Sequence, residues 1–262
     1  MSLSDQDFAK FACAYRAAEL VQPDMKIGLG TGSTAAWLVK CLARRREVEG
    51  LRFAAAATSI RTTELAESLG IKIDALDDLG RLDLTIDGAD EFDPDLNMIK
   101  GAGAALLVEK IVATASNRMV VITDRSKKVE KLGGVFPVPV EVIQYGHKTT
   151  ARMMADVLAA QGDALATQEI VLRMSGDTPL ITDEGHYIYD LTLGRIDTPQ
   201  ALSDALLSIA GVVETGLFLD VADRVVIGDA DGTTELLDRG GAVEDGKTTK
   251  DMLDAALADI GA

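Results

Sequence analysis

The sequence predicts an α/β fold, with a Rossmann-like, mainly parallel sheet covered by helices on both faces and a smaller ferredoxin-like α+β domain. Short apolar strands alternate with helices through the first half of the chain, which is typical of parallel sheets. Later elements follow the order β-α-β-β-α-β, which is ferredoxin-like. We therefore expect a Rossmann-like domain at 1–136 and 211–235, a small domain at 137–210, and a C-terminal tail of unknown role at 236–262.

Strands and helices are expected in turn over the first half. Ser4 or Asp5 can cap a helix that runs to about Leu20, because a side-chain oxygen there satisfies a free N–H group. Glycines at 30, 32 and 70 separate or end other elements, since glycine adopts turn conformations easily. The expected strands are 26–29, 52–57, 71–73, 82–86 and 119–123, and the expected helices are 4–20, 33–46, 58–70 and 104–115.

The second half is expected to change pattern. The turn Asp183-Glu184-Gly185 predicts a hairpin between strands at 180–182 and 187–193. Thr198 before Pro199 predicts a helix start, with an N-cap followed by proline at the first helical position. Further strands are expected at 138–143, 168–174, 212–217 and 224–227, the last returning to the first sheet, and further helices at 147–162 and 248–260.

Composition limits the class of protein. The 262 residues carry a net charge of −16, which phosphate backbones and anionic membranes repel, so we expect no nucleic-acid and no membrane partner. Cys13 and Cys41 are the only cysteines, which argues against a disulfide framework. With no signal-peptide pattern at the N-terminus and no apolar run of about 20 residues, we expect a cytoplasmic protein.

A glycine-rich turn runs from Gly28 to Thr34, between an expected strand and helix. Glycines let the backbone approach an anion, the helix start offers N–H groups, and Thr31 and Ser33 add hydroxyls. Phosphate binding is the leading interpretation, and a turn without a ligand is the alternative. Ser33 stands where a dinucleotide fingerprint needs glycine, which argues against a nucleotide cofactor.

An acidic turn, Asp87-Gly-Ala-Asp90, follows another expected strand, where open α/β sheets bind ligands. A calcium loop starting at Asp93 would require glycine and glutamate where the chain has Met98 and Ala104, so that interpretation fails. A solvated acidic turn remains the alternative.

Glu109 is a lone carboxylate among apolar neighbours on an expected helix, and burial there would raise its pKa toward that of a working base. A salt bridge to Lys110 is the alternative.

Two lysines can hold an anionic oxygen or be ordinary surface charges: Lys100, before a second glycine turn, and Lys127, after a strand end. His147 and His186 have no ligand-like spacing, so we expect no metal site.

Together these segments resemble the ribose-5-phosphate isomerases of type A. The resemblance covers about residues 4–228. It rests on Gly30–Thr34, Thr58-Ser59 with Leu69–Ile71, Asp87–Glu91, Met98–Gly101, Glu109–Ile111, Phe136–Val142 and Gly216–Phe218.

The resemblance implies interconversion of ribose 5-phosphate and ribulose 5-phosphate through an enediolate, in the non-oxidative pentose phosphate pathway, without a cofactor. It implies that Glu109 is the general base, that Asp87, Asp90 and Lys100 act on sugar hydroxyls, ring opening and the oxyanion, and that the enzyme is a homodimer or homotetramer. The substrate- and phosphate-binding residues that it implies are Lys10, Thr31, Gly32, Ser33, Thr34, Gly88, Ala89, Gly101, Ala102, Gly103 and Lys127.

Two departures and two rival functions remain. Ala102 stands where the family often has glycine, so it would be strained if the backbone there has positive φ. The segment 143–147 also differs from the family.

The first rival function is a sugar-phosphate-sensing regulator, which would carry a basic helix-turn-helix; the acidic composition argues against it. The second is a nicotinamide dehydrogenase, against which Ser33 argues. The isomerase hypothesis requires Glu109 to face the same cavity as the turn after the first strand.

Overall fold

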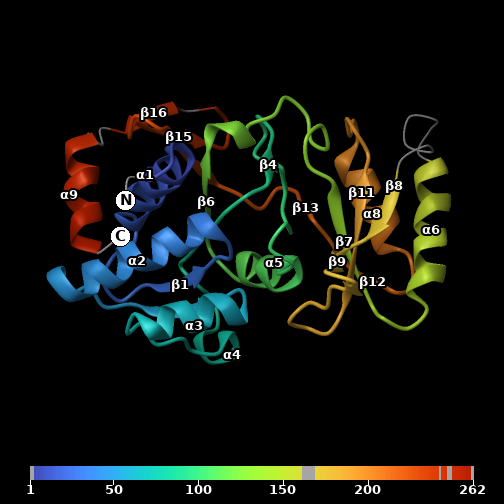
Figure 1. The fold of residues 1–262 in the computed structure, drawn as a ribbon, viewed down its shortest axis with the longest axis horizontal. Coiled ribbons are helices and arrows are strands. Elements are labelled where there is room, and N and C mark those ends of the chain that lie inside the picture. The colour runs from blue at the N-terminus through green and yellow to red at the C-terminus, as the bar shows by residue number, and fades with distance from the viewer. Residues whose placement is uncertain (1–2, 161–168, 242, 247–249, 261–262) are drawn as a thin grey trace. The chain divides into compact units, whose positions relative to one another are not determined.

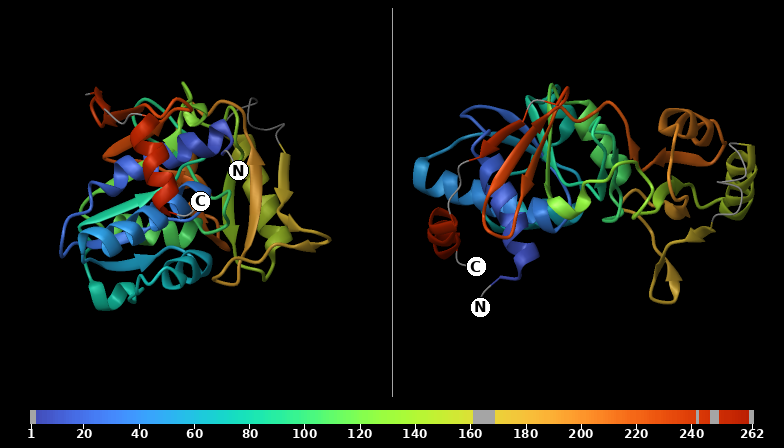
Figure 2. Two further views of the ribbon diagram at one scale, coloured as in Figure 1. Left: turned by 60° about the vertical axis from the view of Figure 1, so that its left-hand side comes forward. Right: turned by 90° about the horizontal axis from the view of Figure 1, so that it is seen from above.

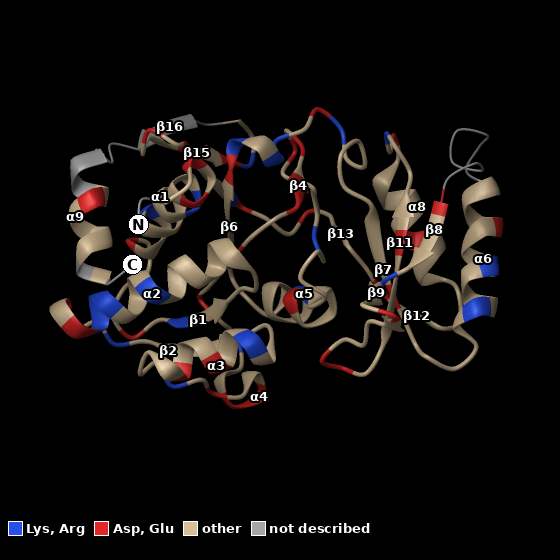
Figure 3. Cartoon of the chain, in the orientation of Figure 1, with Lys and Arg blue, Asp and Glu red and all other residues tan. Residues whose placement is uncertain are grey.

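The computed structural model describes residues 3–160, 169–241, 243–246 and 250–260 (Figure 1). The chain forms two compact units, the first from residues 1–89, 108–127 and 221–262, and the second from 90–107 and 128–220. No helix in the described part of the chain is long and apolar enough to span a membrane. Acidic residues, coloured red in Figure 3, occur in helices and loops of both units.

The first unit contains a seven-stranded sheet in the order β16-β15-β14-β6-β3-β1-β2. The five strands from β14 to β2 are parallel, and β15 and β16 add an antiparallel hairpin at one edge. This is the mainly parallel sheet that the sequence predicts. Its strands are β1 (Lys26–Leu29), β2 (Ala54–Ala57), β3 (Leu84–Asp87), β6 (Met119–Asp124), β14 (Arg224–Gly228), β15 (Thr234–Asp238) and β16 (Val243–Gly246).

Helices cover both faces of this sheet. Alternate residues of β1 point to opposite sides, so Ile27 and Leu29 join the core under the first two helices, while Gly28 faces Val112 of α5. The last helix packs on α2 (Figure 1), with Leu253 fully buried. The helices are α1 (Asp5–Ala18), α2 (Ser33–Glu49), α3 (Ile60–Ser68), α4 (Leu76–Leu79), α5 (Leu106–Thr114) and α9 (Lys250–Ile260).

The second unit contains an antiparallel four-stranded sheet in the order β12-β7-β11-β8. With α6 and α8 this is the predicted ferredoxin-like arrangement. The hairpin of β9 and β10 extends away from the sheet (Figure 2). The elements are β7 (Val138–Val142), α6 (His147–Ala160), β8 (Glu169–Leu172), β9 (Met174–Ser175), β10 (Thr178–Pro179), β11 (Tyr187–Thr192), α8 (Pro199–Leu207) and β12 (Val212–Thr215).

A small three-stranded sheet also belongs to the second unit, because β4 (Glu91–Phe92) and β13 (Leu217–Phe218) both pair with β5 (Met98–Ile99). The units therefore divide the chain at other residues than the predicted domains do: 90–107 and 128–136 pack with the second unit, and the predicted tail packs with the first. The predicted domain bounds themselves stay a prediction.

Several predicted elements are corrected. Residues 71–73 form no strand, because a single bond from Asp74 N–H to the Ala55 carbonyl joins this segment to β2. Residues 180–182 form no strand either, but the predicted turn at 183–185 is present, because Thr182 N–H donates to the His186 carbonyl at 2.9 Å. An additional hairpin, of β9 and β10, turns at Gly176, whose φ is +61°. α4 and the β15–β16 hairpin were not predicted. The expected helix end at Gly162, strand start at Gln168 and helix start at Thr248 lie outside the described residues.

Helix starts follow the predicted chemistry more closely. The Ser4 hydroxyl accepts the Asp7 N–H at 3.1 Å, and the Ser59 hydroxyl accepts the Thr62 N–H at 3.2 Å. Pro199 opens α8 after Thr198, although the Thr198 side chain makes no capping bond.

Candidate active site

The glycine turn after β1 lies against the end of β3. Gly30 N–H donates to the Ile86 carbonyl at 3.0 Å, and Thr31 N–H donates to a carboxylate oxygen of Asp87 at 3.0 Å. A Cβ on Gly30 would lie 2.0 Å from that carboxylate, so only glycine fits there. The glycine at 30 therefore allows the backbone of the turn to approach the acid.

Hydroxyl groups join this turn to the start of α3. Thr31 Oγ1 lies 2.7 Å from Thr58 Oγ1 and 2.8 Å from Ser59 Oγ, and the Thr62 hydroxyl donates to the Gly30 carbonyl at 3.0 Å. The turn is thus fixed by side chains from the next strand and helix along the chain.

The N-terminus of α2 follows the turn directly. Gly32 is its N-cap, with φ +115° and no capping side chain, and Ser33 at the first helical position is exposed. N–H groups at such a helix start attract anions. The structure therefore gives the predicted phosphate turn the backbone that anion binding needs.

Asp87 stands at the point where the strand order reverses. β1 has β2 on one side and β3 on the other, and ligands in open α/β sheets bind outside the carboxyl ends at such a point. Asp87 is fully buried, and one of its carboxylate oxygens accepts the N–H groups of both Thr31 and Gly88. This acid therefore also orients the turn.

Glu109 lies in the first turn of α5 and is 3% exposed, in line with the burial predicted for it. The Thr85 hydroxyl donates to the Val112 carbonyl at 3.4 Å, and Asn117 N–H donates to the Leu82 carbonyl at 2.8 Å. Later residues of α5 thus lie beside earlier residues of β3, so the helix runs opposite to the strand. The first turn of α5 therefore points toward the carboxyl end of β3.

The lysines at 10 and 127 belong to the same edge. α1 packs on β6 and β14, and a Cβ on Gly228 at the end of β14 would lie 2.0 Å from the Ala9 carbonyl. Lys10 is next along α1, with its Nζ 3.8 Å from Asp7. Lys127 is half-buried in the short 3-10 turn that follows β6. Both cations therefore lie near the carboxyl ends of β6 and β14.

Five other predicted site residues belong to the second unit, namely Asp90, Lys100, Gly101, Ala102 and Gly103. Asp90 accepts the Ala102 N–H at 2.9 Å. Lys100 is 3% exposed, and its Nζ lies 5.5 Å from the centre of the Phe218 ring. Gly101 has φ +117°, but Ala102 is not left-handed, so the alanine there carries no such strain. The non-glycine residue with positive φ in this turn is Ala104, at +59°.

Glu91 has a role that the sequence did not indicate. It is 1% exposed and accepts the N–H groups of Gly133 at 2.7 Å and Val135 at 2.6 Å, as well as that of Phe136. This carboxylate holds a loop of the second unit rather than extending a solvated acidic turn.

Both histidines have partners, as expected for structural side chains. His147 Nδ1 lies 2.8 Å from the Tyr189 hydroxyl, and His186 Nδ1 lies 3.0 Å from the Glu141 carboxylate. Among the residues that the structure describes, no group of three or more His, Cys, Asp or Glu side chains could hold a metal ion.

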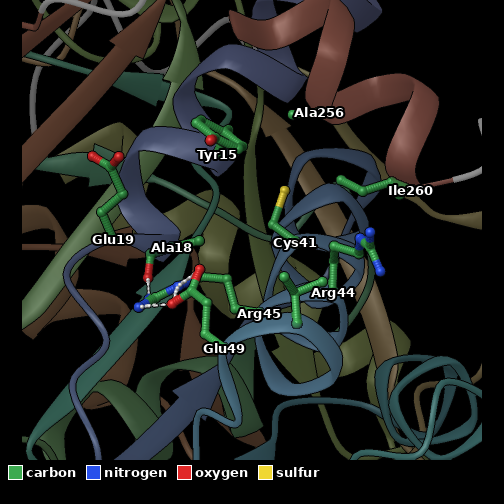
Figure 4. Close-up of a pocket in the computed structure, with 10 residues that line it drawn as sticks. Tyr15, Ala18, Glu19, Cys41, Arg44, Arg45, Glu49, Ala256 and Ile260 are labelled. Carbon is green, nitrogen blue, oxygen red and sulfur yellow. Dashed lines mark hydrogen bonds and ion pairs between the residues drawn. The ribbon is translucent and has the colours of Figure 1, made fainter.

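Another cavity, of about 390 Å³, lies between α1, α2 and α9 in the first unit (Figure 4). Tyr15, Cys41 and Ile260 line part of it. Burial raises the pKa of the Cys41 thiol to about 12, so a thiolate nucleophile is not available near neutral pH. The carboxylates that line it, Glu19 and Glu49, are exposed and form ion pairs with Arg16 and Arg45, unlike the buried Asp87.

A doubly wound sheet with a hydroxyl-rich glycine turn and a buried carboxylate at its switch point defines an α/β enzyme for a small anionic substrate. The sequence pattern of the family described as ribose 5-phosphate isomerase A (phosphoriboisomerase A) matches residues 54–232. The chain belongs to this family, so it is an aldose–ketose isomerase.

Individual relatives support the same assignment. A protein of Cereibacter sphaeroides named ribose-5-phosphate isomerase A is 55% identical over 260 residues, which cover 99% of this chain and 98% of the relative. A D-ribose-5-phosphate isomerase solved with phospho-erythronic acid has a TM-score of 0.83 at 36% identity, covering 89% of this chain and 99% of its own. The Plasmodium falciparum ribose 5-phosphate isomerase has a TM-score of 0.82 at 31% identity, covering 92% and 100%.

Proposed function

We propose that the enzyme interconverts D-ribose 5-phosphate and D-ribulose 5-phosphate through an enediolate, with Glu109 as the general base. The observation that carries this proposal is the nearly complete burial of a carboxylate in the first turn of α5. A carboxylate held away from bulk water in a fixed position is the kind of group that transfers protons to and from a small substrate.

The direction of α5 supports a common site for this base and the phosphate turn. Val112 lies beside Gly28 on the sheet face that α5 covers. Glu109 precedes Val112 by about one helical turn, which places it about 5 Å closer to the carboxyl edge of the sheet. Gly30 follows Gly28 by two residues, which places it about 7 Å closer to the same edge. One small substrate at this edge can therefore meet both.

The chemical step follows from the groups available. Glu109 removes the proton from C2 of the open-chain aldose and returns it to C1. A second proton passes from O2 to O1 in the enediolate, so that the carbonyl at C1 becomes a hydroxyl and the hydroxyl at C2 becomes a carbonyl. The intermediate carries negative charge on oxygen, which nearby cations and N–H groups stabilise. We assign Asp87, Asp90 and Lys100 to the sugar hydroxyls, to ring opening and to this oxyanion, in accordance with the family resemblance.

Phosphate binding supplies the orientation. We assign it to the turn of Thr31, Gly32, Ser33 and Thr34 with the cations Lys10 and Lys127, because these groups lie at one edge of the sheet. Gly88, Ala89 and the 101–103 turn are assigned to substrate contacts. Binding energy at the phosphate holds C1 and C2 against the base. A relative was solved with phospho-erythronic acid, which combines a phosphate with a planar carboxylate, and we expect it to inhibit this enzyme competitively.

Replacing the base tests the proposal. Glu109→Gln should lower kcat for ribose 5-phosphate by about 10²–10⁴-fold, the usual share of a positioned base. The assay contains a chelator, so that it also tests whether a metal is needed. Glu67→Gln, an exposed glutamate on α3, is the matched control and should keep its turnover. Near-normal turnover of the Glu109 variant would refute the assigned base.

The family resemblance also supports a homodimer or homotetramer, a cytoplasmic location and a place in the non-oxidative pentose phosphate pathway. Light scattering of the purified protein tests the first point. A mass of two or four chains is expected, and a stable, fully active single chain would contradict it.

A further inference from the structure

A cavity of about 360 Å³ lies beside the glycine turn, between α2 and α3 of the first unit. Its size is within the range of small-molecule sites, roughly 300–1,000 Å³. Gly32 and Ser33 line it at the N-terminus of α2, and Ala36 and Val39 extend its wall along that helix. The cavity therefore begins at the turn to which we assign the substrate phosphate.

Arg61 lines the same cavity from the first turn of α3. Its side chain is exposed, and no hydrogen bond or ion pair to its guanidinium occurs among the described residues, although Glu64 follows three positions later. In contrast, Arg45, Arg125 and Arg173 all bind carboxylates. A cation in the first turn of a helix is disfavoured by the helix dipole. The Arg61 guanidinium is thus available to bind an anion at this cavity.

We propose that Arg61 binds the phosphate group of the substrate, together with the 31–34 turn; this rests on the proposed function. A planar guanidinium can donate two parallel hydrogen bonds to phosphate oxygens, which an unpaired arginine on the cavity wall is available to do. The need for it follows from the charge of the chain, which at −16 repels an anionic substrate. Lys10 and Lys127 cannot take over this contact, because they lie near the ends of β6 and β14, whereas Arg61 lies on the α3 side of the turn.

Steady-state kinetics of Arg61→Gln test the inference. KM for ribose 5-phosphate should rise about tenfold with kcat unchanged, because the lost contact is to a group remote from C1 and C2. The inhibition constant of inorganic phosphate, acting competitively, should rise by the same factor. Arg61→Lys keeps the charge but loses the planar pair of donors, so its KM and its phosphate inhibition constant should lie between those of Arg61→Gln and the wild type.

Arg52→Gln is the matched control. Arg52 is also an exposed arginine of the first unit, but it precedes β2 and so lies at the amino end of the strand whose carboxyl end leads to α3. It should leave both constants unchanged. The proposal would be overturned if KM and the phosphate inhibition constant of Arg61→Gln were within twofold of those of the control. It would also be overturned if phosphate inhibited non-competitively, or if Arg61→Gln lowered kcat at constant KM.

Calorimetric binding of inorganic phosphate separates this inference from the function on which it rests. Binding needs no turnover, so it reports on Arg61 even if Glu109→Gln keeps its activity. Weaker phosphate binding by Arg61→Gln than by Arg52→Gln supports the role, and equal binding refutes it. Equal thermal midpoints of the two variants exclude a loss of folding as the cause.

Discussion

Asp87 and Glu91 are four positions apart in one acidic run, yet they hold different backbone segments in two regions of the molecule. Both are almost completely buried, and both accept backbone N–H groups. The donors of Asp87 are the turn after β1 and its own neighbour Gly88, at the switch point of the large sheet. Those of Glu91 belong to the loop at 133–136 of the second unit.

Burial and the number of accepted hydrogen bonds therefore do not distinguish an acid of the candidate site from a structural one. The difference lies in what the bonded backbone does: the Thr31 turn leads into a helix N-terminus that attracts anions, whereas the loop bound by Glu91 leads into β7. Removing Glu91 should therefore affect stability through the loop.

Glu91→Gln should lower the free energy of unfolding by about 3 kcal/mol, the largest stability effect we expect. The amide keeps one acceptor oxygen but turns its NH₂ group toward buried N–H donors, which leaves them unsatisfied. Urea unfolding measures the loss. Asp95→Asn, an exposed acid of the same run, is the control and should change little. A loss below about 0.5 kcal/mol for the Glu91 variant would contradict the structural role.

Glu141 adds a third kind of buried carboxylate, held by side chains. Located on β7, it accepts the Thr182 hydroxyl at 2.9 Å and lies 3.0 Å from His186 Nδ1. Burial raises the pKa of Glu141, despite the opposing effect of these two partners, and Glu184 raises it further. The folded state therefore favours the protonated form of this acid.

The consequence for stability depends on pH. The contribution of Glu141 is fully present below the ordinary glutamate pKa of 4.5 and is lost as pH rises through the raised value. Glu141→Gln, which stays neutral, should thus be more stable than the wild type at pH 8, with the difference vanishing near pH 4. Unfolding curves at both pH values test this. A variant less stable than the wild type at pH 8 would show that the bonds to Thr182 and His186 outweigh burial.

Local signals made the first strand, turn and helix predictable. β1 has the predicted bounds 26–29, and α2 starts at Ser33 as expected, because an apolar strand, glycines and hydroxyls are adjacent in the sequence. Ile71 and Ile73 alternate like a strand but pack without the ladder of bonds that would make them one. The β15–β16 hairpin escaped prediction because its segment is acidic and glycine-rich, with a short apolar run.

The residues of the candidate site could be proposed one by one from the sequence, but their arrangement could not. Rules for strand ends and glycine turns indicated Asp87 and Thr31 separately, whereas the bond between them spans 56 positions. The donors of Glu91 lie 42 to 45 positions later, so its acidic neighbours suggested a solvated turn. Arg61 was missed because an arginine early in a helix carries no motif, and its value follows from the cavity that it lines.

The two glycine turns extend the comparison to smaller effects. After β1, glycine is required at 30 by close approach to Asp87 and at 32 by a φ of +115°. In the second unit, Gly101 has φ +117°, Ala102 is not left-handed, and Ala104 is left-handed at +59°. The glycine that the family often carries at 102 is therefore not required by the backbone, while alanine at 104 is strained.

Ala104→Gly and Ala102→Gly should consequently change stability in opposite directions. Glycine at 104 relieves the left-handed conformation and should raise the midpoint of thermal unfolding, corresponding to at most about 1 kcal/mol. Glycine at 102 only adds freedom to the unfolded chain and should cost about 0.4–1 kcal/mol. Each variant serves as the control for the other, since both make the same chemical change two residues apart. Shifts of the same sign would show that φ at 104 does not govern the stability of this turn.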